Sequence, residues 1–178
     1  VPPALGTRLR MELELLLGRE PWAEALRLLQ AWSALPLIDP WLQTEPALTR
    51  RLSWAVRLGL PAMAALVATA SDPIALARRL QIPVQQQRWL EELVELRSWL
   101  LEEVLTRPWS DWGALDWTRK IEGRRWSVEA VALSVVDKPS CWRPLLRWWG
   151  RWRRIHAPQT ARDLIAAGWQ PGPEIGEE

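Results

Sequence analysis

The stretch VQQQRWLEELVELRSWLLEEVLT, residues 84–106, decides the fold class of this chain. Its apolar residues recur at the three- and four-residue spacing of an α-helix, and Pro108 ends the pattern. These apolar residues are Leu90, Leu93, Val94, Leu100, Leu101 and Val104. The sequence therefore predicts one long helix of about six turns in the middle of the chain.

The segments on both sides of this stretch show the same helical spacing, punctuated by proline and glycine. Upstream we predict a helix over 8–17, with Thr7 as its N-cap and Gly18 as its stop, and further helices that begin at Pro21, Pro46, Pro61 and the sequence Ser71-Asp72-Pro73. Downstream we predict helices over 109–121, 127–136, 140–154 and 163–167. No strand alternation and no Asn-Gly or Asp-Gly hairpin turn occurs. The sequence predicts an all-α fold, an array of about ten short antiparallel helices.

Composition predicts a cytoplasmic protein with no membrane-spanning segment. A single cysteine excludes an internal disulfide framework, and no apolar run reaches the roughly 18 residues that a membrane span requires. The 15 tryptophans, without any phenylalanine or tyrosine, are attributed to genome base composition. The chain opens on Val1 and stops at Glu178 within an apparent helix start, which predicts a fragment of something longer.

The chain holds few residues suited to catalysis. Nucleophilic triads and zinc sites need histidines or cysteines, and this chain has only His156 and Cys141. It has no glycine-rich phosphate loop and no Asp-x-Asp pair for magnesium-dependent phosphoryl or nucleotidyl transfer. We therefore expect no catalytic residue and no metal site in this chain.

Charge is segregated along the sequence although the net charge is only +2. Seven basic residues and no acidic residue lie between Lys138 and Arg162, whereas the rest of the chain holds 16 basic and 21 acidic residues. Such segregation favours a local anionic partner over a uniformly basic surface.

The predicted helix over 140–154 places these charges on one side. At 100° per residue, four arginines fall within a stripe of about 80°, and the apolar residues fall on the opposite side. The stripe consists of Arg143, Arg147, Arg151 and Arg154, and the apolar side of Trp142, Leu145, Leu146, Trp149 and Trp152. The planar arginine fork suits phosphate oxygens, so a row of four predicts contact with a nucleic-acid backbone. Two alternatives stay open, a solvated charged face and contact with an anionic bilayer through residues 147–154.

Two segments resemble bacterial CCA-adding tRNA nucleotidyltransferases and their poly(A) polymerase relatives. The segment DLIAAGWQPGPEIGE, residues 163–177, is similar to the closing segment of that family, in which a helix, a glycine turn and a Pro-Gly-Pro step lead into the last helix. The segment TRLRMELELLLG, residues 7–18, is similar to the one that follows the family's nucleotide-reading motif, and LPLIDP at 35–40 matches its leucine-rich break. The two similar ends bracket essentially the whole chain.

The resemblance implies the neck, body and tail of a seahorse-shaped enzyme that grips tRNA. On this basis we expect a neck-like RNA-binding domain over 1–60, a helical body over 61–137, and the basic helix and tail motif over 138–178. The family's catalytic head, which uses Mg²⁺ with CTP or ATP, would precede Val1. This chain contains neither the Glu-Asp-x-x-Arg nor the Asp-x-Asp motif of that head, so we expect it to bind without catalysing and to hold no cofactor itself.

The resulting functional hypothesis is a tRNA-binding portion of an enzyme that adds CCA, or part of it, to tRNA 3′ ends. The expected tRNA contacts are Arg143, Arg147, Arg151, Arg153 and Arg154, helped by Arg119, Lys120, Arg124 and Arg125, with Gly172 offering backbone N–H groups to a phosphate. The expected partners are tRNA and the catalytic head, and not a membrane. The alternatives are a helical protein-interaction scaffold and a peripheral binder of anionic membranes.

Overall fold

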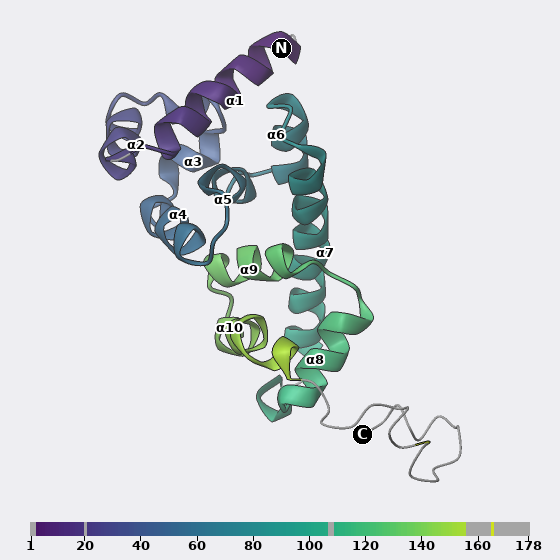
Figure 1. Cartoon of the computed structure of the whole chain (residues 1–178). Coiled ribbons are helices and arrows are strands. Elements are labelled where there is room, and N and C mark those ends of the chain that lie inside the picture. The colour runs from purple at the N-terminus through teal and green to yellow at the C-terminus, as the bar shows by residue number, and fades with distance from the viewer. Residues whose placement is uncertain (1–2, 20, 107–108, 156–164, 166–178) are drawn as a thin grey trace.

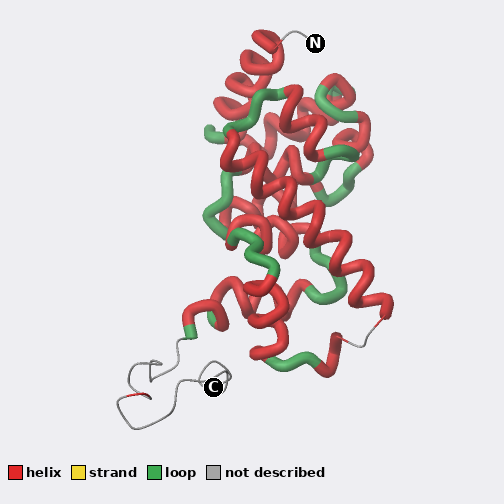
Figure 2. Tube along the Cα trace, turned by 90° about the vertical axis from the view of Figure 1, so that its right-hand side faces the viewer, coloured by secondary structure: helices red, strands yellow, loops and turns green. Residues whose placement is uncertain are grey.

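The computed structural model describes residues 3–19, 21–106, 109–155 and 165. Within these ranges the chain is all-helical and has no strand, which confirms the predicted fold class (Figures 1 and 2). The α-helices are α1 (Pro3–Leu17), α2 (Trp22–Ala31), α3 (Pro40–Thr44), α4 (Leu48–Arg57), α5 (Ala62–Ala68), α6 (Pro73–Arg79), α7 (Val84–Thr106), α8 (Ala114–Gly123), α9 (Val128–Asp137) and α10 (Trp142–Gly150). Short 3-10 helices are η1 (Leu35–Leu37), η2 (Trp109–Asp111) and η3 (Trp152–Arg154). No helix in the described ranges is long and apolar enough to cross a membrane.

Several helices begin and end where their local sequence predicts. Asp72 caps α6 by accepting hydrogen bonds from the backbone N–H groups of Ile74 and Ala75, at 3.1 and 2.9 Å. Ser127 caps α9 by accepting from Ala130 N at 3.2 Å. Helix α7 spans the predicted 84–106, and Gly59 adopts a positive φ of 76° after α4, a conformation that costs glycine little.

Other predicted boundaries are wrong. Thr7 is not an N-cap, because α1 already begins at Pro3 and Thr7 lies inside it. The single helix predicted over 109–121 is divided into η2 and α8, and α8 begins after Gly113, whose N–H donates to Asp116 Oδ2 at 2.8 Å. The short helix α3 was not predicted. It begins at Pro40 after Asp39, whose carboxylate accepts from Trp41 N at 2.9 Å. The helix predicted over 163–167 lies outside the described residues, apart from Ile165.

Helix α7 runs down one side of the molecule and lines both of its hydrophobic cores (Figure 1). The leucine core lies among α1–α6, the first half of α7 and one face of α9. Its fully buried members include Leu26, Leu35, Leu42, Leu48, Leu52, Leu66, Leu80, Leu90 and Leu93. The tryptophan core lies among the second half of α7, the other face of α9, α8 and α10. It consists of Leu96, Trp99, Leu100, Trp117, Ile121, Trp126, Val131, Val135, Cys141, Leu145 and Trp148.

Helix α9 is the wall between the two cores. Every residue from 130 to 136 is buried, because Leu133 and Val136 face the leucine core while Val131 and Val135 face the tryptophan core. A helix that is apolar on all sides is stable only when it is covered on all sides. The expected domain boundaries lie at residues 60 and 137. Helix α4 packs on α5 across the first boundary, and α9 packs on α10 across the second.

A partly buried ion cluster at the end of α9 links α4, α7 and α9. Asp137 Oδ1 lies 2.8 Å from Arg51 Nη1 of α4, and Asp137 Oδ2 lies 2.6 Å from Arg97 Nη2 of α7. Arg97 Nη2 also donates to the carbonyl of Ala68 at 2.7 Å. Burial raises the pKa of the Asp137 carboxyl group, and the two guanidinium groups oppose this rise. The two guanidinium groups therefore compensate the negative charge that Asp137 places between the two cores.

Candidate nucleic-acid interface

The basic segment forms a shorter helix than the sequence predicts. Helix α10 ends at Gly150, and Arg151 leaves the helical region with φ −131° and ψ −58° before η3 begins. Glycine has a low helix propensity, so a helix ends easily at such a residue. The prediction of one continuous helix up to Arg154 is therefore wrong, and the predicted arginine stripe is divided between α10 and η3.

The buried side of α10 is centred on Leu145 and Trp148. Leu145 is 0% and Trp148 is 3% exposed, whereas Trp149 and Trp152 are only half-buried. The predicted apolar face is correct for Leu145 but omits Trp148. The reason is tertiary: α10 contacts both α8 and α9, and this pair of neighbours covers the sector that holds Trp148.

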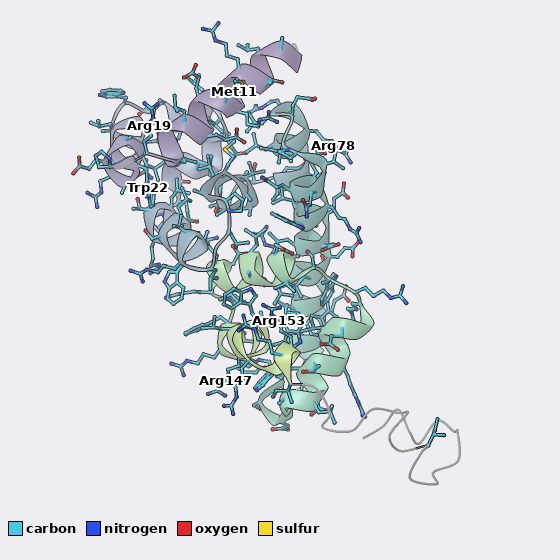
Figure 3. The ribbon with its side chains drawn as sticks, viewed as in Figure 1. Met11, Arg19, Trp22, Arg78, Arg147 and Arg153 are labelled. Atoms are coloured by element: carbon cyan, nitrogen blue, oxygen red, sulfur yellow. The ribbon has the colours of Figure 1, made fainter. Side chains whose placement is uncertain are left out.

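The predicted arginines do point outward. Arg143 and Arg147 on α10, Arg151 after it and Arg154 in η3 are all exposed. Figure 3 shows Arg147 at the outer edge of α10. Arg153 is half-buried, and its Nε donates to the carbonyl of Trp149. These five arginines, called the arginine face below, form no ion pair with any carboxylate in the part of the chain that the structure describes.

The expected helpers in and after α8 differ in how free their charges are. Helix α8 packs beside α10 and η3, so it lies in the same half of the molecule. However, Lys120 Nζ lies 3.5 Å from Glu103 Oε2 and 4.3 Å from the Trp112 ring centroid, so its charge is already paired. Arg124 follows α8 and is exposed, and its guanidinium carbon lies 4.9 and 5.6 Å from the Trp99 and Trp126 ring centroids, contacts that do not neutralise its charge.

Three expected tRNA contacts remain, and only two of them lie among the described residues. Arg119 and Arg125 are exposed, and Gly172 lies outside the described residues. His156 also lies outside these residues.

A second row of cations borders the arginine face and was missed by sequence reasoning. The Lys138 ammonium lies 5.7 Å from the ring centroids of both Trp54 and Trp142. Arg57 lies 6.0 Å from the Trp54 ring, and Arg143 lies 5.5 Å from the Trp142 ring. This aromatic–cation row, Arg57-Trp54-Lys138-Trp142-Arg143, connects α4 to α10 across the end of α9. A signal for it exists in the sequence, because residues 46–71 contain Arg50, Arg51 and Arg57 and no acidic residue.

Two observations on the described residues bear on nucleophilic and metal chemistry. These residues contain no group of three or more His, Cys, Asp or Glu side chains that could hold a metal ion. Cys141 is fully buried, and burial raises the pKa of its thiol to about 11, which keeps it protonated near neutral pH. What the described surface offers is a set of exposed cations suited to anion binding.

Comparison with known proteins adds no identification. No protein-family model matches the chain, and no curated protein or solved structure is significantly similar to it.

Proposed function

We propose that this chain binds RNA by contacting phosphates with the arginine face of α10 and η3. The observation that carries the proposal is the exposure of Arg143, Arg147, Arg151 and Arg154 with no carboxylate partner among the described residues. Arg143 and Arg147 are one helical turn apart, about 6 Å along the axis, so two guanidinium groups can face one backbone. A guanidinium group without a carboxylate partner keeps its full charge for a phosphate.

The RNA we propose is tRNA, and the proposed setting is the neck, body and tail region of a tRNA nucleotidyltransferase. Support comes from the sequence resemblance at the two ends of the chain and from the all-helical architecture. Phosphate contacts position a ligand without reading its bases, which suits a protein that serves every tRNA. In this proposal, nucleotide addition belongs to a head domain that precedes Val1.

The test is fluorescence anisotropy of labelled tRNA over a range of salt concentrations. Binding should weaken steeply with salt, because each phosphate contact releases counterions. The double variant Arg147→Glu, Arg151→Glu should bind at least about tenfold more weakly than the wild type. An affinity that does not change with salt, or a double variant that binds normally, contradicts the proposal.

A matched control separates this face from net charge. Arg78 and Arg88 are 69% and 75% exposed on α6 and α7, and Figure 3 places Arg78 at the opposite end of the molecule. The double variant Arg78→Glu, Arg88→Glu changes net charge by the same amount as the first one. It should lose little affinity, because its charges lie far from the arginine face.

A second candidate function is that of a helical scaffold for another protein. The observation in its favour is a group of exposed apolar side chains near the end of α2, in η1 and in α3. Trp32 is 71%, Leu37 is 78% and Trp41 is 55% exposed. Exposed aromatic rings are common in protein interfaces. Normal tRNA binding by the Arg147→Glu, Arg151→Glu variant would favour this function over the first.

A further inference from the structure

We infer that the RNA-binding surface does not end at α10 but continues to α4 along the aromatic–cation row, with Lys138 as its central contact. The inference rests on the proposed function and extends it to Lys138, Arg57 and the two tryptophans that orient them. Arg143 belongs to both the arginine face and the row, so the two surfaces are continuous. A phosphate backbone that leaves Arg147 past Arg143 meets Lys138 next and then Arg57.

The cations of the row are oriented without being neutralised. The face of an indole ring attracts a cation through its quadrupole but carries no net charge. Lys138 and Arg57 are exposed, while Trp54 and Trp142 are half-buried, and Trp54 packs against the leucine core. Lys120 gives the contrast, because its ring contact is accompanied by an ion pair with Glu103. The row therefore keeps positive charge available for phosphate oxygens.

The nearest carboxylate in the sequence does not cancel this charge. Asp137 directly precedes Lys138, but its two carboxylate oxygens are bound by Arg51 and Arg97. Two acid-free segments, 46–71 and 138–162, contribute the cations of the row and of the arginine face. The fold thus brings together basic residues from sequence positions about 80 apart, with no carboxylate partner for Lys138 or Arg57 among the described residues.

The backbone of Lys138 allows a test that separates stability from binding. Lys138 occupies the left-handed region, with φ 53° and ψ 54°, at the C-terminal end of α9. Glycine is the residue that fits this position without steric cost, and lysine is disfavoured there. Ser33, Gln81 and Arg125 adopt the same left-handed conformation after α2, α6 and α8, so this conformation belongs to the helix end and is not specific to Lys138. A glycine at this position would end α9 at a lower steric cost, but it would remove the ammonium group.

This conflict between stability and binding supplies the test. Lys138→Gly should bind labelled tRNA about fivefold more weakly and lower the salt slope by about one, while its melting temperature stays equal or rises. Lys138→Gln removes the charge without changing the backbone demand and should weaken binding to the same extent. Lys138→Arg keeps the charge and should retain affinity. Ser33→Gly is the matched control, because Ser33 is also left-handed, with φ 53°, but carries no charge.

The outcomes distinguish the inference from the function on which it rests. Normal affinity of Lys138→Gly and Lys138→Gln, together with weak binding by Arg147→Glu, Arg151→Glu, overturns the row and leaves the arginine face intact. No tRNA binding by the wild type, or normal affinity of all these variants, overturns both. Weaker binding by Lys138→Gly and Lys138→Gln at undiminished thermal stability, with Ser33→Gly unaffected, supports the row.

Discussion

The leucine core and the tryptophan core differ in the side chains that fill them and in the number of helices that surround them. The leucine core draws on α1–α7 and α9, and fills its space with leucine and alanine brought together by many helices. The tryptophan core draws on only α7–α10, and relies on Trp99, Trp117, Trp126 and Trp148. A tryptophan buries about 150–250 Å², so four rings replace many smaller side chains. With fewer helices, each buried side chain carries more of the stability.

The tryptophan rings also contact one another. The ring centroid of Trp117 lies 5.0 Å from that of Trp112 and 6.2 Å from that of Trp99, and both pairs are edge-to-face. Edge-to-face pairs add stability beyond that of the buried area. The cost is polar: the indole N–H groups of Trp99, Trp117 and Trp148 are buried and find no acceptor among the described residues. The leucine core carries no such cost, because its side chains have no polar atoms.

The largest effect is expected for Trp117→Ala in the tryptophan core. Trp117 is 0% exposed, and its loss leaves a cavity among rings that cannot collapse. We expect a loss of about 4 kcal/mol in the free energy of unfolding, measured by urea denaturation and far-UV circular dichroism. The matched change in the leucine core, Leu66→Ala, should cost about 3 kcal/mol.

The control for this prediction is Trp117→Phe. It keeps most of the ring and removes the indole N–H that has no acceptor, so it should cost less than about 1.5 kcal/mol. Were Trp117→Phe as damaging as Trp117→Ala, ring packing would not be what stabilises this core. A larger loss for Leu66→Ala than for Trp117→Ala would reverse the comparison.

A smaller effect is expected for Gly6→Ala, which tests how closely helices approach at the edge of the leucine core. A Cβ atom on Gly6 would lie 2.0 Å from the Arg79 carbonyl oxygen at the end of α6. Two backbones must then separate, and we expect a loss of about 2 kcal/mol, with faster hydrogen exchange in α1.

Gly123→Ala is the corresponding control in the other half. A Cβ atom on Gly123 meets no atom within 4 Å, so the variant should be as stable as the wild type or up to about 1 kcal/mol more stable. Equal stability of Gly6→Ala and the wild type would show that α1 does not pack against α6 at this distance.

The smallest effect is expected for the native protein without substitution. The reactivity of Cys141 reports how often the tryptophan core opens enough to expose this buried thiol. Burial raises the pKa of its thiol to about 11, so at pH near 8 the thiolate fraction is far below that of an ordinary cysteine. Alkylation by iodoacetamide should be on the order of a hundredfold slower than in urea at the same pH. The native rate should rise with pH up to about 8.5, the pKa of an ordinary cysteine, because the fully buried thiol reacts only after the core opens and then ionises as a free thiol. Rapid native alkylation at pH 8 would mean that this core opens readily.

The candidate site could be predicted in part. The exposure of Arg143 and Arg147 follows from the amphipathic spacing of α10, which is a local property, whereas Arg151 and Arg154 are exposed outside that helix. The pairing of Lys120 with Glu103 could not be predicted, since it depends on how α8 packs against α7. The aromatic–cation row through Lys138 could not be predicted either, because its two tryptophans lie on helices that are far apart in the sequence.

The sequence by itself determined where most helices lie. Caps such as Asp72 and Ser127 and the glycine stop at Gly59 act within a few residues, so their effect can be read from neighbouring letters. Only the tertiary structure decided that α9 separates two cores, that Trp148 is buried, and that α4 and α10 contribute to one row of cations. These features arise from contacts between distant helices, which helical periodicity does not specify, because periodicity shows that a helix has a buried face but not which neighbour covers it.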